Sequence, residues 1–257
     1  MKKLLPALFL AFAFFSCKNE KSDPTPNQEL LLYPTEITRT TSHSPDVVKI
    51  KYTYNSENQI VKEEVFGNNV LERSSVFSYF ADGNLHFKQV YGSTGRFLEQ
   101  DEMVYNGGTL PQKLLHSYID STGTPNLHHK RMYLFEANGN ITRWSDQTPD
   151  NYLINSRTYL YKSNNLVETT GTGDHGQFQD KIELTFDGKM DPFANTNINP
   201  VRFAGNELKM EMKNQAGQVI SFYTNAYEYN DKGFPVKKIQ TLSDGTVKTE
   251  TYVYKSE

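Results

Sequence analysis

The sequence predicts an all-β domain of consecutive antiparallel hairpin repeats that form a twisted, curled meander. Three observations predict this fold class. Doublets of the form apolar-x-aromatic recur along the chain, turn clusters rich in Gly, Asn and Asp follow them, and no segment shows helical periodicity over the length of a globular helix. The sequence leaves open whether the meander forms an open spiral, a sandwich or a barrel-like sheet, because strand number alone does not determine shear.

The doublets define a repeat. They are Tyr52/Tyr54, Phe77/Tyr79, Met103/Tyr105, Tyr133/Phe135, Tyr159/Tyr161, Leu184/Phe186, Val201/Phe203, Tyr227/Tyr229 and Tyr252/Tyr254. Successive second members are 25, 26, 30, 26, 25, 17, 26 and 25 residues apart. A nearly constant spacing is the signature of a repeated structural unit. We therefore expect about nine hairpin-like units.

Residues two apart in a strand point to the same face of the sheet, so each doublet places two large side chains side by side. The intervening positions are mostly polar, which is typical of antiparallel sheets with one apolar face and one wet face. We interpret the doublets as core rather than as an exposed binding surface. Two segments break the spacing. We expect a longer loop at 120–130, and at 186–200 an insertion in place of a strand, because Pro192 and Pro200 cannot sustain a sheet interior.

The N-terminal residues MKKLLPALFLAFAFFSC have a basic start and an apolar run too short to span a bilayer as a helix. This pattern predicts a signal peptide at 1–16. Cys17, the only cysteine, follows Ser16 at the end of the run, and this ending resembles the bacterial lipoprotein box. We therefore expect a lipidated Cys17 that attaches the protein to a membrane, then a flexible tether with a lead-in segment over 17–47, and a single β domain over 48–257.

The segments YTYNSENQI, FSYFADGNL, YLFEANGNI and YEYNDKGFP resemble YD repeats, the Rhs-type repeat, over about residues 48–255. With its N-terminus, the chain is similar to the YD-repeat-like lipoproteins of unknown function in Bacteroidetes. The resemblance implies an outer-membrane lipoprotein that faces either the periplasm or the cell surface. Phe80, Glu136 and Lys162 depart from the Asp of the repeat. Nine units cannot enclose a polypeptide, so the shell function of long Rhs-type proteins does not transfer.

Composition and motifs narrow the chemistry. The net charge is −3 without a basic stripe, which argues against nucleic acid as a partner. No Gly-x-Ser-x-Gly or phosphate-binding glycine loop occurs. The neighbours His128 and His129 are expected on opposite sides of a strand, and the histidine spacings do not suggest a metal site. We therefore predict no metal, no cofactor and no catalytic residues, although a site assembled from distant positions stays open.

The candidate ligand contacts are Trp144, the only tryptophan, together with Asp187, Asp191 and Phe193 of the insertion. Tryptophan faces stack on sugars and peptides, but they also build cores, and the sequence does not decide between these roles for Trp144. Three functions remain. They are a non-catalytic binding or scaffold module for a glycan, peptide or protein, an enzyme acting on envelope or dietary polymers, and a structural spacer.

Overall fold

The computed structural model describes residues 32–162, 165–193, 196 and 205–256. Leu31–Glu257 form one compact unit. Its strands are β1 (Leu32–Thr41), β2 (Ser44–Tyr54), β3 (Ile60–Gly67), β4 (Val70–Tyr79), β5 (Leu85–Gly92), β6 (Phe97–Tyr105), β7 (Pro111–Ile119), β8 (Pro125–Phe135), β9 (Ile141–Gln147), β10 (Leu153–Lys162), β11 (Asn165–Gly173), β12 (Phe178–Phe186), β13 (Glu207–Lys213), β14 (Val219–Tyr229), β15 (Pro235–Leu242) and β16 (Val247–Ser256). A single-turn 3-10 helix covers Asp174–Gly176. Among the described residues, no helix is long and apolar enough to cross a membrane.

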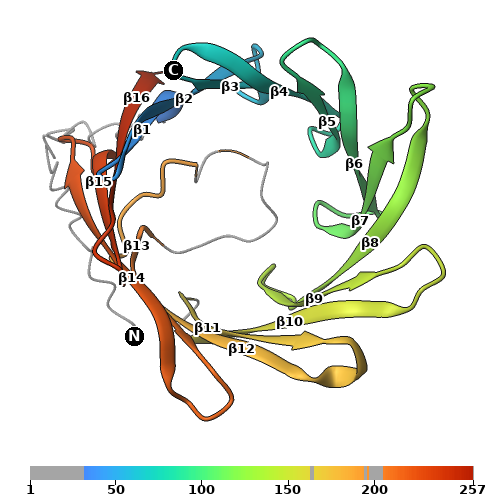
Figure 1. Ribbon diagram of the computed structural model, residues 1–257. Helices are drawn as coiled ribbons and strands as arrows, with labels where there is room; N and C mark the ends of the chain where they lie inside the picture. Colours follow the sequence, from blue (N-terminus) through green and yellow to red (C-terminus); the bar gives the residue numbers. More distant parts are fainter. Residues whose placement is uncertain (1–31, 163–164, 194–195, 197–204, 257) are drawn as a thin grey trace, which may run out of the picture. The chain divides into compact units, whose positions relative to one another are not determined.

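The sixteen strands form a closed antiparallel barrel in which each strand pairs with its neighbours in the chain and β1 pairs with β16 (Figure 1). The all-β hairpin meander is confirmed, and of the three arrangements left open it is the barrel. Ile37 of β1 lies opposite Tyr252 of β16 and opposite Ile50 of β2, so the first and last strands share one inward-facing core.

Two sequence-based boundaries change. The sheet begins at Leu32 rather than at 48, because β1 has no doublet to mark it as a strand and was assigned to the lead-in segment. The expected long loop at 120–130 is wrong: a tight turn follows Ile119, and β8 begins at Pro125. The extra residues lengthen β8 instead, because its pairing with β7 runs from Pro125 opposite Ile119 to Met132 opposite Lys113.

One turn type recurs at both ends of the barrel. In nine of the described turns, the first residue donates its N–H to the carbonyl four residues later and accepts a bond from the N–H three residues later. The fourth residue has a positive φ in each case, as in Asn58 (58°) and Gly233 (82°). This is the three-residue hairpin loop whose left-handed position favours Gly or Asn. The clusters of Gly, Asn and Asp that were predicted to be turns thus form the hairpin turns.

The doublets lie on the eight even-numbered strands, near the end where each strand enters its next turn. The count of nine units is therefore wrong for the described chain. Leu184/Phe186 on β12 and Tyr227/Tyr229 on β14 have only β13 between them, and the extra chain length is the connection 187–206 that precedes β13, which is why the spacing is irregular there. The doublet Val201/Phe203 falls outside the described residues.

Tyrosines of the doublets bridge the places where neighbouring hairpins separate. The pairing of β3 with β4 stops at Lys62 and Val76, before the end of β4. Beyond it, the Tyr79 hydroxyl donates to the carbonyl of Ile60 at 2.7 Å. Tyr54 and Tyr254 make the equivalent bonds to Pro34 (2.7 Å) and Pro235 (2.6 Å). The second doublet position thus supplies a hydrogen bond where the backbone ladder ends.

The doublet face is the inner face of the barrel. One cluster of buried residues contains Ile37 and Tyr252, and another contains Ile60 and Met103; Phe193 packs against both. Phe193 belongs to the insert, residues 187–206, whose coloured part lies inside the ring of strands in Figure 1. Barrels of about sixteen strands are too wide for wall side chains to fill. The inner wall is accordingly half-buried in many positions, with the core confined to patches.

The outer face across β11–β13 carries ion pairs. Lys181 pairs with Glu168 at 2.7 Å, and Lys213 pairs with Glu183 at 2.6 Å. Lys209 pairs with Glu211 of its own strand at 2.6 Å. A lysine on the lipid-facing side of a membrane barrel costs about 2–4 kcal/mol near the midplane. This part of the wall therefore has the composition of a surface that faces water.

Candidate functional site: the inner wall of the barrel

The inward face of β8–β10 holds a compact group of aromatic and charged side chains. The Arg131 guanidinium lies 4.3 Å from the centre of the Trp144 ring and donates two hydrogen bonds to Asp146, at 2.7 and 2.9 Å. Trp144 Nε1 donates to the Tyr159 hydroxyl at 2.7 Å. We call Arg131, Trp144, Asp146 and Tyr159 the inner-wall platform. Its members sit on facing positions of neighbouring strands, since Trp144 is opposite both Tyr133 and Arg157.

The platform continues onto β10–β12 through a second ion pair. Arg157 donates to Thr169 at 2.7 Å and to Asp180 at 2.9 Å. Arg131 and Arg157 each lie two residues before a doublet tyrosine, so the strand alternation places them on the same face as the aromatic residues. A bidentate arginine–carboxylate pair fixes both partners, and an arginine over a tryptophan face adds a cation–π contact.

The electrostatics follow from this pairing. The hydrogen bonds and charge of Asp146 raise the pKa of Arg131 above its ordinary value, although burial opposes the shift. Burial raises the pKa of the neighbouring Tyr133 hydroxyl to about 12. The wall therefore presents fixed arginine charges and neutral hydroxyls at physiological pH. The side chain of Arg131 keeps 34% of its surface exposed, so a ligand can contact it.

Three histidines extend the wall over β7 and β8, and here the sequence-based expectation is wrong. His116 pairs with His129, but the register shifts before Leu127, so His128 is an extra residue in a β-bulge. The bulge brings His128 and His129 to one side, with their Nδ1 atoms 3.0 Å apart. His116 Nδ1 lies 2.7 Å from Asp101, and burial is the main cause that lowers the pKa of His129. In the part of the chain that the structure describes, no group of three or more His, Cys, Asp or Glu side chains could hold a metal ion.

Asp187 holds the neck of the insert. Its carboxylate accepts hydrogen bonds from the N–H groups of Lys189 and Asn206, each at 2.9 Å, and from the Tyr229 hydroxyl. Asn206 in turn donates its side-chain amide to the Met190 carbonyl at 2.9 Å. The φ of +146° at Gly205 fits the same closure, because a Cβ there would lie 2.6 Å from the backbone of Gly188. The hydrogen-bonding capacity of the Asp187 carboxylate is thus used mainly by the backbone of the insert.

Asp191 and Phe193 seat the insert against the barrel wall. Asp191 accepts the N–H of Phe193 at 2.7 Å, and burial raises the pKa of this carboxyl group. The Phe193 ring contacts Tyr52 edge-on, with the ring centres 5.4 Å apart. The edge-to-face contact and the burial of an aromatic side chain both stabilise this position.

The four candidate contacts therefore divide into two groups. Trp144 lies in the middle of β9 on the inward face, and it belongs to the inner-wall platform. Asp187, Asp191 and Phe193 all belong to the insert. Sequence reasoning assigned Tyr159 to the core with the other doublets and missed Arg131 and Asp146. The available signal was spacing: Arg131 lies two residues before Tyr133, and Asp146 lies two residues after Trp144. Cys17 lies outside the described residues.

Comparison with solved structures identifies the barrel. A porin-like protein from Bacteroides uniformis matches with a TM-score of 0.60 and 10% sequence identity, over 86% of this chain and 98% of that chain. A porin-like protein from Bacteroides vulgatus matches with a TM-score of 0.52 and 10% identity, over 88% of this chain and 99% of that chain. The chain has a porin-like barrel fold. At this identity the likeness shows the porin-like fold alone.

A further match, to the Tc holotoxin pore of Photorhabdus luminescens, has a TM-score of 0.37 and 14% identity over 75% of this chain and 11% of that chain, and it carries no argument. No protein-family model matches the sequence, and no curated protein matches it.

The neck of the insert predicts a pH dependence of stability. Burial opposes the shift, but the hydrogen bonds from Tyr229, Lys189 and Asn206 lower the pKa of Asp187 in the folded state. A lowered pKa stabilises the fold above the unfolded pKa of about 4, and this stabilisation is lost as pH falls through the folded value. We expect Asp187→Asn to lose about 1–2 kcal/mol at pH 7 and to show a weaker further loss between pH 4 and 3 than the wild type.

Urea denaturation at pH 7, 4 and 3 measures this effect. Asp231→Asn is the matched control, since Asp231 is exposed in the turn after β14. Equal pH profiles for the wild type and Asp187→Asn would show that Asp187 does not hold the neck.

Proposed function

We propose that this protein is a lipid-anchored envelope protein that binds a glycan, peptide or protein segment, without catalysis, on the inner wall of its barrel. The observation that carries the proposal is the inner-wall platform. Trp144, Tyr159 and Arg131 present flat faces and hydrogen-bonding edges that are already held by one another and by Asp146. A ligand that stacks on such a surface finds side chains that lose little conformational freedom on binding.

The ionic groups of the wall favour binding over catalysis. Arg131 pairs with Asp146, and Arg157 pairs with Asp180. A general acid or base has to exchange a proton with substrate, and a group held in a tight ion pair is poorly placed to do so. Burial raises the pKa of two other carboxyl groups, those of Asp191 and Glu207. Both groups already have a hydrogen-bond partner within the protein, because Asp191 accepts the N–H of Phe193 and Glu207 is hydrogen-bonded to the Tyr223 hydroxyl.

The charged outer face and the N-terminal sequence both support a barrel that is tethered to a membrane by lipid. The ion pairs across β11–β13 favour a wall in water, and the apolar N-terminal run followed by Ser16 and Cys17 supports attachment by lipid. In this proposal the chain is a YD-repeat-like lipoprotein of the outer membrane, facing either the periplasm or the cell surface. The porin-like neighbours from Bacteroides are compatible with that compartment.

The single tryptophan provides the binding test. Trp144 is the only tryptophan, so intrinsic fluorescence reports on the platform alone. We expect titration with a panel of envelope oligosaccharides and unstructured peptides to give a saturable fluorescence change for one ligand class. Calorimetry on Trp144→Ala should then show affinity for that ligand reduced about tenfold or more, since loss of a stacking face costs about 1–3 kcal/mol by analogy with base stacking.

The matched control is Tyr152→Ala, because Tyr152 is 74% exposed in the turn after β9. Saturable binding that Trp144→Ala leaves unchanged would refute the inner-wall site. Turnover of the bound ligand would support the enzyme alternative, and a panel without any binder would support the structural spacer.

The lipid anchor has a separate test. Thioether lipidation requires the Cys17 thiol, and several acyl chains hold a protein firmly on a membrane. We expect Cys17→Ser to move the protein from the membrane fraction to the soluble fraction without detergent. Retention of the Cys17→Ser variant in the membrane would contradict both the anchor and the view that the outer wall faces water.

A further inference from the structure

A pocket opens at the rim of the barrel where the tyrosine bridge between hairpins is not made. Its volume is about 520 Å³, and it is lined by Phe80, Ala81, Asp82, Glu102, Met103, Val104 and Tyr105. This volume lies in the range of small-molecule sites. The pocket is separate from the inner-wall platform, because its residues come from β6 and from the turn between β4 and β5.

The end of the β5–β6 ladder explains why there is an opening here. The first pair between these strands is Tyr91 with Phe97, and the last is Phe87 with Glu102. Met103–Tyr105 of β6 therefore have no partner on β5. At the equivalent place in other hairpins, a tyrosine hydroxyl bonds the carbonyl across the gap, as Tyr79 does to Ile60. Tyr105 instead contacts the ring of Phe80 edge-on, with the ring centres 6.0 Å apart.

Phe80 departs from the repeat, and the turn in which it lies does not need a phenylalanine at this position. At the equivalent position, Asn55 and Asn230 accept backbone N–H groups of their own turns. A phenylalanine cannot do this, and in this turn Asp82 accepts the N–H of Asn84 at 3.1 Å instead. The Phe80 ring stacks on His86 at 4.0 Å and keeps 40% of its surface exposed. Its side chain is thus free to form a wall of the pocket.

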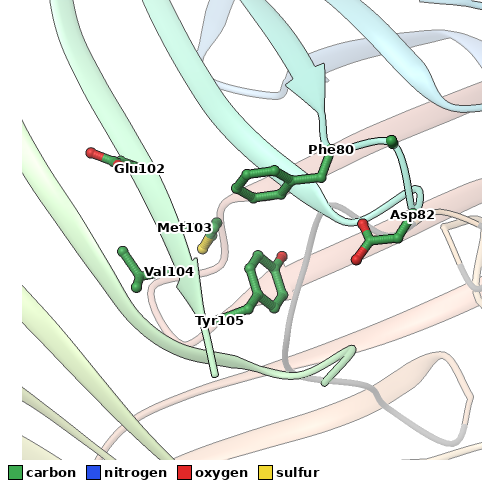
Figure 2. A pocket seen from close by; sticks show the side chains of 7 residues that line it. Phe80, Asp82, Glu102, Met103, Val104 and Tyr105 are labelled. Carbon is green, nitrogen blue, oxygen red and sulfur yellow. The ribbon is translucent and has the colours of Figure 1, made fainter. Parts of the chain in front are cut away.

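The lining defines the charge of the ligand. Figure 2 shows the Phe80 and Tyr105 rings beside Met103, with Asp82 next to Tyr105, whereas the Glu102 side chain points away from these rings because it alternates with Met103 and Tyr105 along β6. The lining contains two carboxylates and no basic side chain. Within the described part of the chain, neither Asp82 nor Glu102 forms an ion pair. Aromatic faces beside an uncompensated carboxylate, here that of Asp82, attract organic cations.

The geometry points to a binding site for an ammonium group carried on a short apolar chain, with Phe80 and Tyr105 around the cation and Asp82 as its counter-charge. A free alkylamine and a lysine side chain in a peptide share this chemistry. Met103, which is 7% exposed, forms the apolar floor against which the methylene groups pack.

Calorimetric titration of the full chain tests the site with two probes, n-pentylammonium and an N-acetyl-lysine-amide peptide. We expect at least one probe to bind, and the neutral counterparts pentanol and Nε-acetylated peptide to bind about tenfold more weakly. Asp82→Asn keeps the turn acceptor but removes the charge, and Phe80→Asn introduces the residue found at the equivalent positions Asn55 and Asn230. Each variant should weaken binding about three- to tenfold, and Glu102→Gln by less.

Tyr254→Phe is the control, because it removes the same kind of bridge, to the carbonyl of Pro235, between hairpins that do not line the pocket, and it should leave affinity unchanged. Circular dichroism confirms folding of each variant. Stronger binding of the peptide than of the amine would assign the site to a protein partner, and the reverse would assign it to a free amine. Equal binding of charged and neutral probes, binding insensitive to Asp82→Asn and Phe80→Asn, or no binding of either probe at millimolar concentration would overturn the proposal.

Discussion

The pairing of β1 with β16 is the constraint on which the rest of the structure depends. It runs from Leu32 opposite Ser256 to Thr41 opposite Lys248, and it turns a linear series of hairpins into a closed wall. Without it, both terminal strands would present unpaired edges, which proteins otherwise have to protect. Closure also defines an inside. The doublets that would be one face of an open sheet become the lining of a barrel.

The number of strands then determines what the lining has to be. A wall of sixteen strands encloses more space than its own side chains fill, so the inner face cannot be a continuous apolar core. The protein meets this in two ways. Buried clusters form locally beneath Phe193 of the insert, and elsewhere aromatic residues alternate with paired charges such as Arg131 and Asp146. The same half-buried composition leaves side chains of the inner wall, such as Arg131, partly exposed.

The repeat explains how much was predictable from the sequence. Doublets and turn residues such as Gly233 report local geometry, so the hairpins and their faces could be predicted from their spacing. Closure could not, because it depends on shear and on β1, whose sequence LYPTEITRTT carries no doublet. The Arg131–Asp146 pair likewise requires the register between β8 and β9, and the joint orientation of His128 and His129 requires a bulge that no residue pattern marks. The sequence departs from the repeat at Phe80, which lines the pocket, and at the insert 187–206, whose Phe193 packs against both buried clusters.

Hydrogen exchange of the terminal strands tests the closed barrel most directly. In the full-length protein, peptides covering 32–41 and 247–256 should be protected to the same degree as the peptide covering 111–119, because each strand has a hydrogen-bonded neighbour on both sides. Fast exchange of alternate amides in both terminal strands, with the middle strands still protected, would show an open sheet and contradict the closed inner wall.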